Sequence, residues 1–216
     1  ARDCILSELT GGHIHLCHMS TRGSVELIRR AKAKGLHVTA EVTPHHFTLT
    51  EELTRGYNTH AKMNPPLRTM QDVQAIKEGL RDGTIDVIAT DHAPHATQEK
   101  QQEFTEAPFG IVGLETALSL TLALVDEGVL TLESAVDKLA TAPAKAFSLN
   151  AGTLAVGAPA DVAIVDPNRE WQVDPSRFRS KSRNTPFAGW KVKGRVTTTI
   201  VSGRVVFELD RSERQA

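Results

Sequence analysis

The chain has 216 residues, of which 40% are hydrophobic and 24% charged, a balance typical of a globular protein that buries a core. Its formal net charge of −1 gives no general electrostatic attraction to nucleic acid or to an anionic membrane surface. No apolar run approaches the roughly 20 residues needed to span a bilayer. The two cysteines, Cys4 and Cys17, do not form a disulfide framework, so we expect a reducing, cytoplasmic compartment.

The chain begins with Ala1 rather than Met and opens directly in a predicted helix. Ile5, Leu6 and Leu9 fall on one face of this helix, and Gly11-Gly12 ends it. Because no strand precedes the helix, we expect that an earlier part of the same domain is missing from the chain.

A β-α-β-α-β pattern follows this helix. Strands are predicted over residues 13–18, 36–42 and 85–90, and helices are predicted from a cap at Ser24 and over residues 70–80. The inward face of the first of these helices should comprise Val25, Leu27, Ile28 and Ala31. Short connections between alternating strands and helices favour a parallel sheet, so the three strands should be neighbours that run in one direction.

Polar side chains stand at the end of each of the three strands. In parallel α/β folds this edge of the sheet carries the chemistry. Taken alone, an Asp-His pair is explained equally well by helix capping and surface histidines, but three polar strand ends together favour a metal-dependent hydrolase site. Geometry leaves five candidate ligands open: His18, His45, His46, Asp91 and His95. Cys17 should point away from His18 and be buried as a small apolar residue.

A long polar loop, residues 96–108, follows Asp91 and has the length and position of an active-site loop. Beyond it, helices are predicted over residues 114–125, 132–140 and 143–147, and Asn150-Ala151-Gly152 marks a boundary.

The remaining sequence has the pattern of a small β module. Ser202-Gly203 is typical of a tight hairpin turn, and residues 211–216 should form a frayed charged tail. Short antiparallel strands are predicted over residues 161–166, 171–173, 195–201 and 204–207. We therefore divide the chain into residues 1–150 and residues 151–216.

Five motifs, in this order along the chain, resemble those of the dihydroorotase family of the bacterial class I type. They are Cys-His-Met-Ser-Thr at 17–21, Glu-Val-Thr-Pro-His-His at 41–46, Asn-Pro-Pro-Leu-Arg at 64–68, Thr-Asp-His-Ala-Pro-His at 90–95 and Phe-Gly-Ile-Val-Gly-Leu-Glu-Thr at 109–116. The resemblance implies an α/β fold: strands 6–8 of a metal-dependent (β/α)8 TIM-type barrel in residues 1–150, then a small β-sandwich module. It also implies reversible cyclisation of N-carbamoyl-L-aspartate to L-dihydroorotate in pyrimidine biosynthesis.

The resemblance also assigns roles to residues that geometry leaves undecided. It implies two Zn²⁺ ions in a complete active site, with His18 binding one and Asp91 binding the other. Asp91 would also be the catalytic proton shuttle. Asn64, His95, Phe109 and Gly110 match substrate-binding positions, whereas His45 and His46 match positions that are not primary ligands.

The family's remaining ligands have no counterpart in the chain. These are a His-x-His motif on strand 1, a bridging residue on strand 4 and a histidine on strand 5; an arginine that binds the substrate carboxylate is absent too. We therefore expect the C-terminal half of the enzyme, inactive alone, which associates with an N-terminal half or with itself. Homo-oligomers and association with aspartate transcarbamoylase are the expected protein assemblies.

Two other functions stay open. The first is an inactive dihydroorotase-like subunit that scaffolds aspartate transcarbamoylase, against which the retained His18 and Asp91 argue. The second is another cyclic-amide hydrolase such as an allantoinase. A His-x-His-x-Arg motif in the missing half would favour a dihydroorotase.

Overall fold

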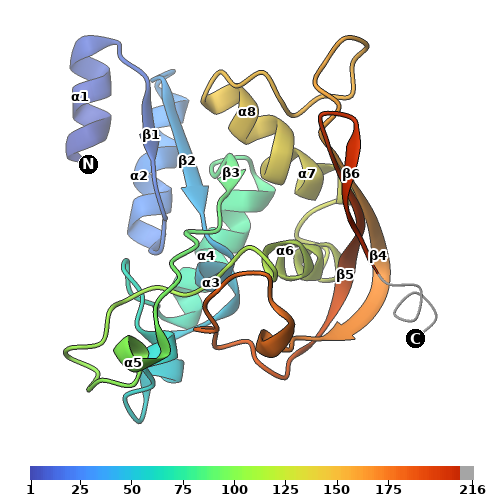
Figure 1. Cartoon of the computed structure of the whole chain (residues 1–216). Coiled ribbons are helices and arrows are strands. Elements are labelled where there is room, and N and C mark those ends of the chain that lie inside the picture. The colour runs from blue at the N-terminus through green and yellow to red at the C-terminus, as the bar shows by residue number, and fades with distance from the viewer. Residues whose placement is uncertain (210–216) are drawn as a thin grey trace.

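Three short parallel strands form the sheet that the sequence predicts. The computed structural model describes residues 1–209, and in it β1 (Ile14–Leu16), β2 (Val38–Val42) and β3 (Val87–Ile88) lie side by side in chain order (Figure 1). Ile14 pairs with Val38, and Glu41 pairs with Val87, in parallel register. The predicted order and direction of the strands are thus confirmed, although each strand is shorter than expected.

Two amphipathic helices connect these strands and pack against each other. They are α2 (Arg22–Ala33) and α4 (Met70–Arg81). Thr21, not Ser24, is the cap of α2, because its side chain accepts a hydrogen bond from the Ser24 amide. Val25, Ile28 and Ala31 are buried as predicted, whereas Leu27 is exposed on the outer face.

The first helix, α1 (Arg2–Thr10), ends at Gly11, whose left-handed backbone lets its amide donate to the Ser7 carbonyl. Its apolar residues Ile5, Leu6 and Leu9 are exposed, and Cys4 makes the contact with the core near β1 and β2. Short helical segments follow β2: α3 (Pro44–Thr48), η1 (Glu51–Thr54) and η2 (Thr59–Ala61).

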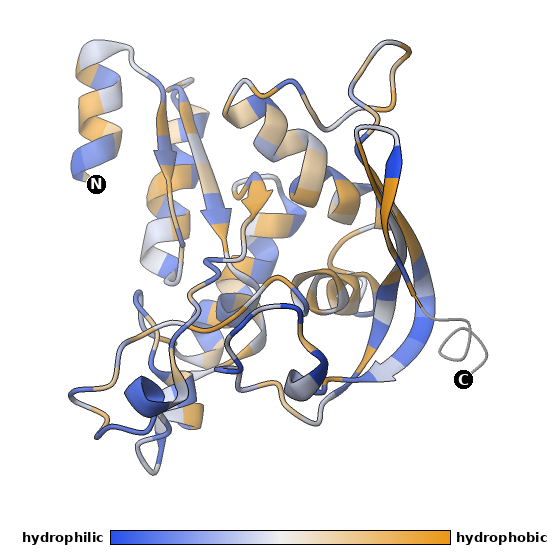
Figure 2. Cartoon of the chain, viewed as in Figure 1, coloured by the Kyte–Doolittle hydropathy of each residue, from blue (hydrophilic) through white to orange (hydrophobic). Residues whose placement is uncertain are grey.

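The polar loop after β3 contains one short helix, α5 (Thr97–Lys100), which lies at the carboxyl ends of the strands (Figure 1). The apolar helix that follows is α6 (Ala117–Asp126), which starts three residues later than predicted. Figure 2 shows α5 as hydrophilic and α6 as largely hydrophobic. No helix in the described part of the chain is long and apolar enough to cross a membrane.

The two helices predicted over 132–140 and 143–147 form one continuous helical run. α7 (Leu132–Val136) passes into a π-helical turn, η3 (Asp137–Thr141), and then into α8 (Ala142–Ala146). Pro143 lacks the N–H that an α-helical bond would use, and a widened turn accommodates such a residue within a helix. Buried Lys138 in this turn donates to the Ile85 carbonyl at 2.6 Å, which ties the run to the strand segment before β3.

A separate antiparallel sheet contains β4 (Val162–Gln172), β5 (Lys191–Val201) and β6 (Arg204–Glu208), with η4 (Pro175–Arg177) after β4. Two of the predicted strands merge into β4, which is irregular between Asp166 and Glu170. Ser202 and Gly203 both have positive φ, as a tight hairpin requires. β4, β5 and β6 form one sheet, and β5 packs on α6. The sandwich expected for residues 151–216 stays a prediction.

One hydrophobic core joins the two sheets. It includes Val42 and Ile88 from the parallel sheet, Leu120 from α6, and Val173 and Phe187 from the C-terminal region. A Cβ at Gly194 of β5 would lie 2.2 Å from the Leu122 side chain, so the contact between β5 and α6 requires glycine. The boundary at 150–152 marks a change of secondary structure, while the core continues across it. The predicted tail, residues 211–216, lies outside the described residues.

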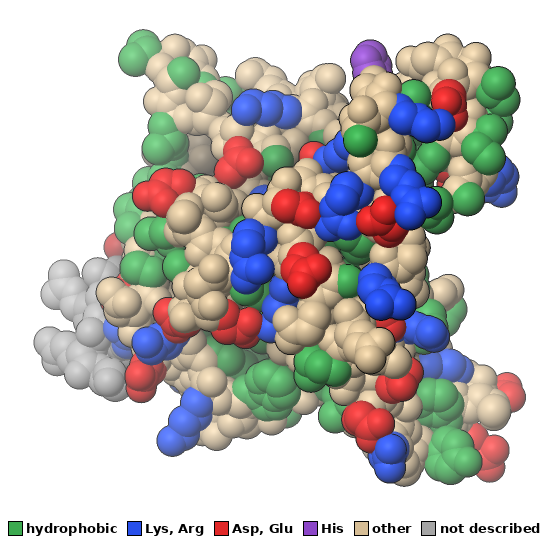
Figure 3. Space-filling model, turned by 180° about the vertical axis from the view of Figure 1, so that it is seen from behind, with side chains coloured by type: hydrophobic (Ala, Val, Ile, Leu, Met, Phe, Trp, Pro, Cys, Tyr) green, Lys and Arg blue, Asp and Glu red, His purple; other side chains and the backbone are tan. Residues whose placement is uncertain are grey.

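On the face opposite to that viewed in Figure 1, basic and acidic side chains alternate (Figure 3). Ion pairs join α2 to the segment between α4 and β3: Arg29 to Asp82 at 2.8 Å and Lys32 to Asp86 at 2.7 Å. Mixed charge of this kind is typical of a solvated outer surface.

Candidate metal and substrate site

His18 and Asp91 meet at the carboxyl ends of β1 and β3. His18 Nε2 lies 3.8 Å from Asp91 Oδ1, and both side chains are partly exposed. The predicted placement of these two residues at one edge of the sheet is therefore confirmed. The His18 imidazole follows β1 and the Asp91 carboxylate follows β3, and the central strand β2 lies between these two strands.

A third residue at this edge, Glu41 on β2, was not singled out as a candidate from the sequence. Its side chain is 7% exposed, and its Oε1 lies 2.8 Å from His18 Nδ1. Its other oxygen, Oε2, lies 3.1 Å from His15 Nε2. Glu41 therefore stands behind His18 and leaves His18 Nε2 directed toward Asp91. We call His18, Glu41 and Asp91 the carboxyl edge.

The backbone at the carboxyl edge is strained. His18 has φ 57° and Asp91 has φ 47°, in the left-handed region that costs a non-glycine residue on the order of 1 kcal/mol. At His18 this conformation breaks the strand alternation, so that His18 turns to Glu41, the residue that His15 also contacts. Strain of this sort is concentrated at functional sites, where surrounding contacts maintain it.

Cys17 is exposed, so the prediction that it is a buried apolar residue was wrong. One ligand atom each of His15, Cys17 and Glu41 lies within 4.8 Å of the others. A chain of polar contacts continues from there, because Thr39 Oγ1 shares hydrogen bonds with His15 Nδ1 at 2.8 Å and with His13 Nε2 at 2.9 Å. The face of the sheet beside the carboxyl edge is thus polar rather than hydrophobic.

His18 and Glu41, which are in contact at the carboxyl edge, shift each other's pKa. The contact with Glu41 raises the pKa of His18 against the opposing effect of burial. Burial acts to raise the pKa of Glu41, but the contacts with His18 and His15 outweigh it and lower that pKa. The Glu41 carboxylate is therefore held ionised in a mostly buried position.

His45 and His46 are buried in α3 and face away from solvent. His46 Nε2 donates to the Pro65 carbonyl at 2.9 Å, so its Nδ1 accepts from the Thr43 hydroxyl at 2.6 Å when the ring is neutral. Burial lowers the pKa of His45 well below its ordinary value and also lowers that of His46. These contacts fit a structural role, in which His46 fixes the segment that carries exposed Asn64.

The other candidate substrate residues lie in one loop, residues 93–110, which we call the 93–110 loop. His95 Nε2 donates to the Phe109 carbonyl at 2.9 Å, which brings the two ends of the loop together. Phe109 itself is 51% exposed. Gly110 has φ 103°, and a Cβ there would lie 2.6 Å from the Ala93 Cβ, so only glycine fits this approach.

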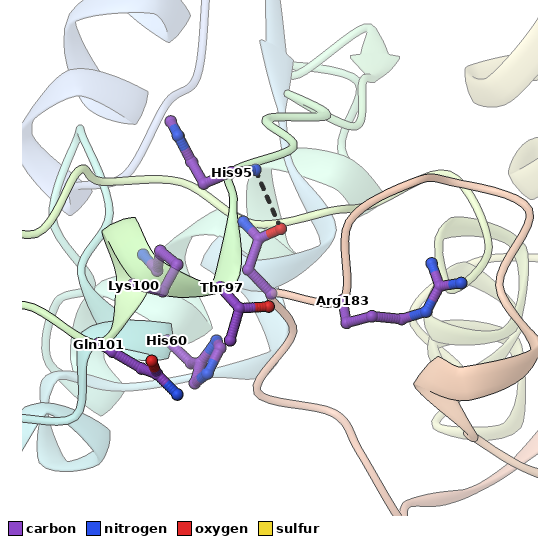
Figure 4. Close-up of a pocket in the computed structure, with 7 residues that line it drawn as sticks. His60, His95, Thr97, Lys100, Gln101 and Arg183 are labelled. Carbon is purple, nitrogen blue, oxygen red and sulfur yellow. Dashed lines mark hydrogen bonds between the residues drawn. The ribbon is translucent and has the colours of Figure 1, made fainter.

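A cavity of about 170 Å³ opens beside this loop. It is lined by His60, His95, Thr97, Lys100, Gln101, Arg183 and Asn184, and Figure 4 shows the Arg183 side chain directed away from the His60 and Lys100 group. Lys100 is 3% exposed, and burial together with the nearby Lys62 lowers its pKa to about 8. Its Nζ donates to the Pro108 carbonyl at 2.8 Å, which fixes it inside the loop.

The donor set at the carboxyl edge fits part of a divalent metal site. Imidazole nitrogen and carboxylate oxygen are ligands that Zn²⁺ and similar ions accept, and a metal-binding histidine usually has its second nitrogen on a carboxylate, as His18 has on Glu41. A catalytic zinc typically has three protein ligands. His18 and Asp91 would supply two such ligands.

The model of the Amidohydrolase family matches residues 5–206. The chain belongs to the amidohydrolase family. Among curated members, the dihydroorotase of Syntrophotalea carbinolica is 60% identical over 209 residues, which cover 97% of this chain and 49% of the relative. The dihydroorotase of Anaeromyxobacter sp. strain K is 57% identical over 99% of this chain and 50% of the relative. The resemblance to dihydroorotases is thereby confirmed.

Solved amidohydrolase structures share the arrangement of these elements. The L-hydantoinase (dihydropyrimidinase) of Arthrobacter aurescens superposes with a TM-score of 0.90 at 34% identity, covering 96% of this chain and 47% of that one. The dihydropyrimidinase of Brevibacillus agri gives a TM-score of 0.89 at 25% identity. The chain spans about half the length of the relatives it matches. Metal binding is typical of this family.

Proposed function

We propose that this chain supplies one part of a dihydroorotase active site. The reaction is the reversible cyclisation of N-carbamoyl-L-aspartate to L-dihydroorotate in de novo pyrimidine biosynthesis, with loss of one water. One observation carries the choice of substrate: the 60% identity to a curated dihydroorotase, which extends over 97% of the chain. The 3.8 Å approach of His18 and Asp91 supports the chemistry.

In this proposal His18 and Asp91 hold the family's metal, and Zn²⁺ is the ion that their nitrogen and oxygen ligands favour. When bound, the metal supplies a Lewis acid that polarises the amide carbonyl and lowers the pKa of a water molecule. Glu41 orients the His18 ring through its 2.8 Å contact and keeps Nε2 directed at the site.

Asp91 is the proposed general base and acid. In the hydrolytic direction its carboxylate accepts the proton of the attacking water and delivers that proton to the ring nitrogen as the amide bond breaks. In the cyclising direction the same carboxylate takes the proton from the carbamoyl nitrogen and returns it to the departing water. Asn64, His95 and the Phe109–Gly110 segment are the proposed substrate contacts.

The two alternatives receive less support. A scaffold subunit without catalysis has no need of the strained backbone at His18 and Asp91. Another cyclic-amide hydrolase would share the carboxyl edge, but the solved hydantoinase named above is less similar to this chain than the dihydroorotases are. We also propose that the active protein is an oligomer; association with aspartate transcarbamoylase is a further proposal from the resemblance.

The test is a chimera in which this chain replaces the matching half of the Syntrophotalea carbinolica dihydroorotase. We expect the chimera, loaded with Zn²⁺, to interconvert L-dihydroorotate and N-carbamoyl-L-aspartate at a rate close to that of the parent relative. The parent enzyme is the positive control, and the 216-residue chain alone should be inactive. Hydantoin and allantoin are offered in parallel.

Two results would contradict the proposal. Turnover of allantoin or hydantoin without turnover of dihydroorotate would assign the chain to a different cyclic-amide hydrolase. A folded chimera that binds Zn²⁺ with the parent's stoichiometry and turns over none of these substrates would favour the scaffold alternative.

A further inference from the structure

Asn184 belongs to the C-terminal region, between η4 and β5, yet its side chain ends inside the 93–110 loop. It is 3% exposed. Its Oδ1 accepts a hydrogen bond from the His95 amide at 3.2 Å (Figure 4). Its Nδ2 donates to the Ala93 carbonyl at 2.8 Å and to the Gly110 carbonyl at 3.2 Å. The loop has two arms, one beginning at Ala93 and the other ending at Gly110. The side-chain amide of Asn184 is therefore hydrogen-bonded to both arms.

The backbone of Asn184 adds a further bond. Its carbonyl accepts from the Val112 amide at 3.0 Å, just beyond the end of the loop. Lys100 makes a second tie from within the loop, because its Nζ lies 3.3 Å from the Gly110 carbonyl that Asn184 also binds. Two donors from different parts of the chain thus converge on one carbonyl oxygen.

The two arms of the loop are in close contact, and the hydrogen bonds from Asn184 stabilise this contact. At Gly110 the backbone has φ 103° and lies against the Ala93 Cβ, so the arms are in direct contact. Loss of the Asn184 donor would take the side-chain hydrogen bond from the partly buried Ala93 carbonyl and leave the buried Gly110 carbonyl with Lys100 alone, which is unfavourable because a polar group away from water needs its partners. A loop that loses these bonds relieves that penalty when its arms separate and water reaches the carbonyls.

We propose that Asn184 is a positioning residue for substrate binding: it holds the two arms of the 93–110 loop together and so fixes His95, Phe109 and Gly110. The proposal rests on the proposed function, because those three residues are the proposed substrate contacts. Asn184 itself acts through the loop backbone. Its loss should weaken substrate binding and leave the proton transfer by Asp91 largely unchanged.

The experiment compares Asn184→Asp with Asn184→Ser in the chimera, and Asn150→Asp at an exposed position is the matched control. Asp keeps the shape of Asn but turns an oxygen, instead of the donor, toward the two carbonyls. Ser keeps a small polar group and avoids the added charge, so it serves if Asn184→Asp does not fold. We expect KM for L-dihydroorotate to rise roughly tenfold in either variant, with kcat within about threefold of the unmodified chimera.

Hydrogen–deuterium exchange gives a second readout that does not depend on turnover. Amides of residues 93–112 should exchange faster in the Asn184 variants, while amides of β1 and β2 keep their protection and Asn150→Asp changes neither. An unchanged exchange pattern together with an unchanged KM would overturn the proposal. A fall in kcat at constant KM would also overturn it, because Asn184 would then act on the chemical step.

The two proposals fail separately in this design. If the unmodified chimera turns over no dihydroorotate, the proposed function fails, and the exchange of residues 93–112 alone still decides whether Asn184 holds the loop.

Discussion

The carboxyl edge and the 93–110 loop are neighbours in the chain, and different kinds of contact hold them. At the edge, charged and aromatic nitrogen groups from three adjacent strands approach within 2.8–3.8 Å, on strained backbone. In the loop, hydrogen bonds join the uncharged side-chain amide of Asn184 to the backbone of Ala93, His95 and Gly110, which lie 74 to 91 residues earlier in the sequence. A parallel sheet brings its strand ends together as it forms, whereas the loop depends on a segment outside the sheet.

This difference separates two tasks. Changes at the carboxyl edge should alter metal binding and the chemical step, and changes that loosen the loop should alter the affinity for substrate. Four substitutions in the chimera follow. Asp91→Asn, His18→Ala and Glu41→Gln change the carboxyl edge, and Lys100→Met changes a buried charge in the loop.

Asp91→Asn should have the largest effect. Asn has the shape of Asp but cannot take up a proton, and general base catalysis typically contributes about 10²- to 10⁴-fold, so we expect kcat to fall by that order. His18→Ala should instead lower the metal content, measured by elemental analysis of the purified protein. Asp137→Asn, at an exposed position, is the control. Near-normal kcat in Asp91→Asn would remove Asp91 from the mechanism.

Glu41→Gln should have an intermediate effect. The substitution keeps the size of the side chain but removes the charge behind His18, and loss of such a supporting group typically lowers metal affinity about 10- to 100-fold. Competition with a metal chelator measures the affinity, and Glu170→Gln on the antiparallel sheet is the matched control. Equal Zn²⁺ affinity in Glu41→Gln and the unmodified chimera would show that Glu41 does not support His18.

Lys100→Met should have the smallest effect, and it should depend on pH. Burial lowers the pKa of Lys100 to about 8, so the folded state releases this proton before the unfolded chain does. Below pH 8 both states are charged and the penalty of burying the charge is complete. As pH rises above 8, the unfolded state binds more protons, so the contribution of Lys100 to stability increases.

Urea unfolding of the chimera at pH 7 and pH 9.5 measures this change. Relative to Lys100→Met, the protein with Lys100 should gain on the order of 1 kcal/mol between the two values. Exposed Lys191→Met provides the control and should show no comparable gain. A stability difference that is the same at both pH values would mean that the Lys100 ammonium pays no burial penalty in the folded state.

The sequence was sufficient to predict the parallel sheet. Residues 13–18 alternate between polar and apolar side chains, residues 85–88 include the β-branched Ile85, Val87 and Ile88, and short helical connections link the strands. It also placed His18 and Asp91 together, since parallel strands present their carboxyl ends at one edge. Glu41 carried a recognisable signal, because it is a carboxylate between the apolar residues Ala40 and Val42 near the end of a predicted strand. Alternation placed Cys17 beside His15, but that face of the sheet is polar and Cys17 is exposed on it. His18 is the residue that departs from alternation, because its left-handed backbone turns it to Glu41.

The loop ties were beyond the reach of the sequence. Asn184 stands in an irregular segment with no periodic pattern, and nothing local relates it to residues 93–110. Buried Lys100 is likewise hidden in a run of Gln, Glu and Lys that reads as a solvated surface. Such contacts depend on the three-dimensional path of the chain, which neither hydrophobic periodicity nor turn chemistry specifies.

The bonds from Asn184 have a consequence for the order in which the protein matures on the ribosome. The strands of the carboxyl edge are all made by residue 91, but the residue that joins the arms of the loop is synthesised 89 positions after His95. At the usual translation rate of about 5–20 residues per second, that interval lasts roughly 5 to 18 seconds. During this time the three strands of the carboxyl edge can pair, while the 93–110 loop still lacks the hydrogen bonds from Asn184.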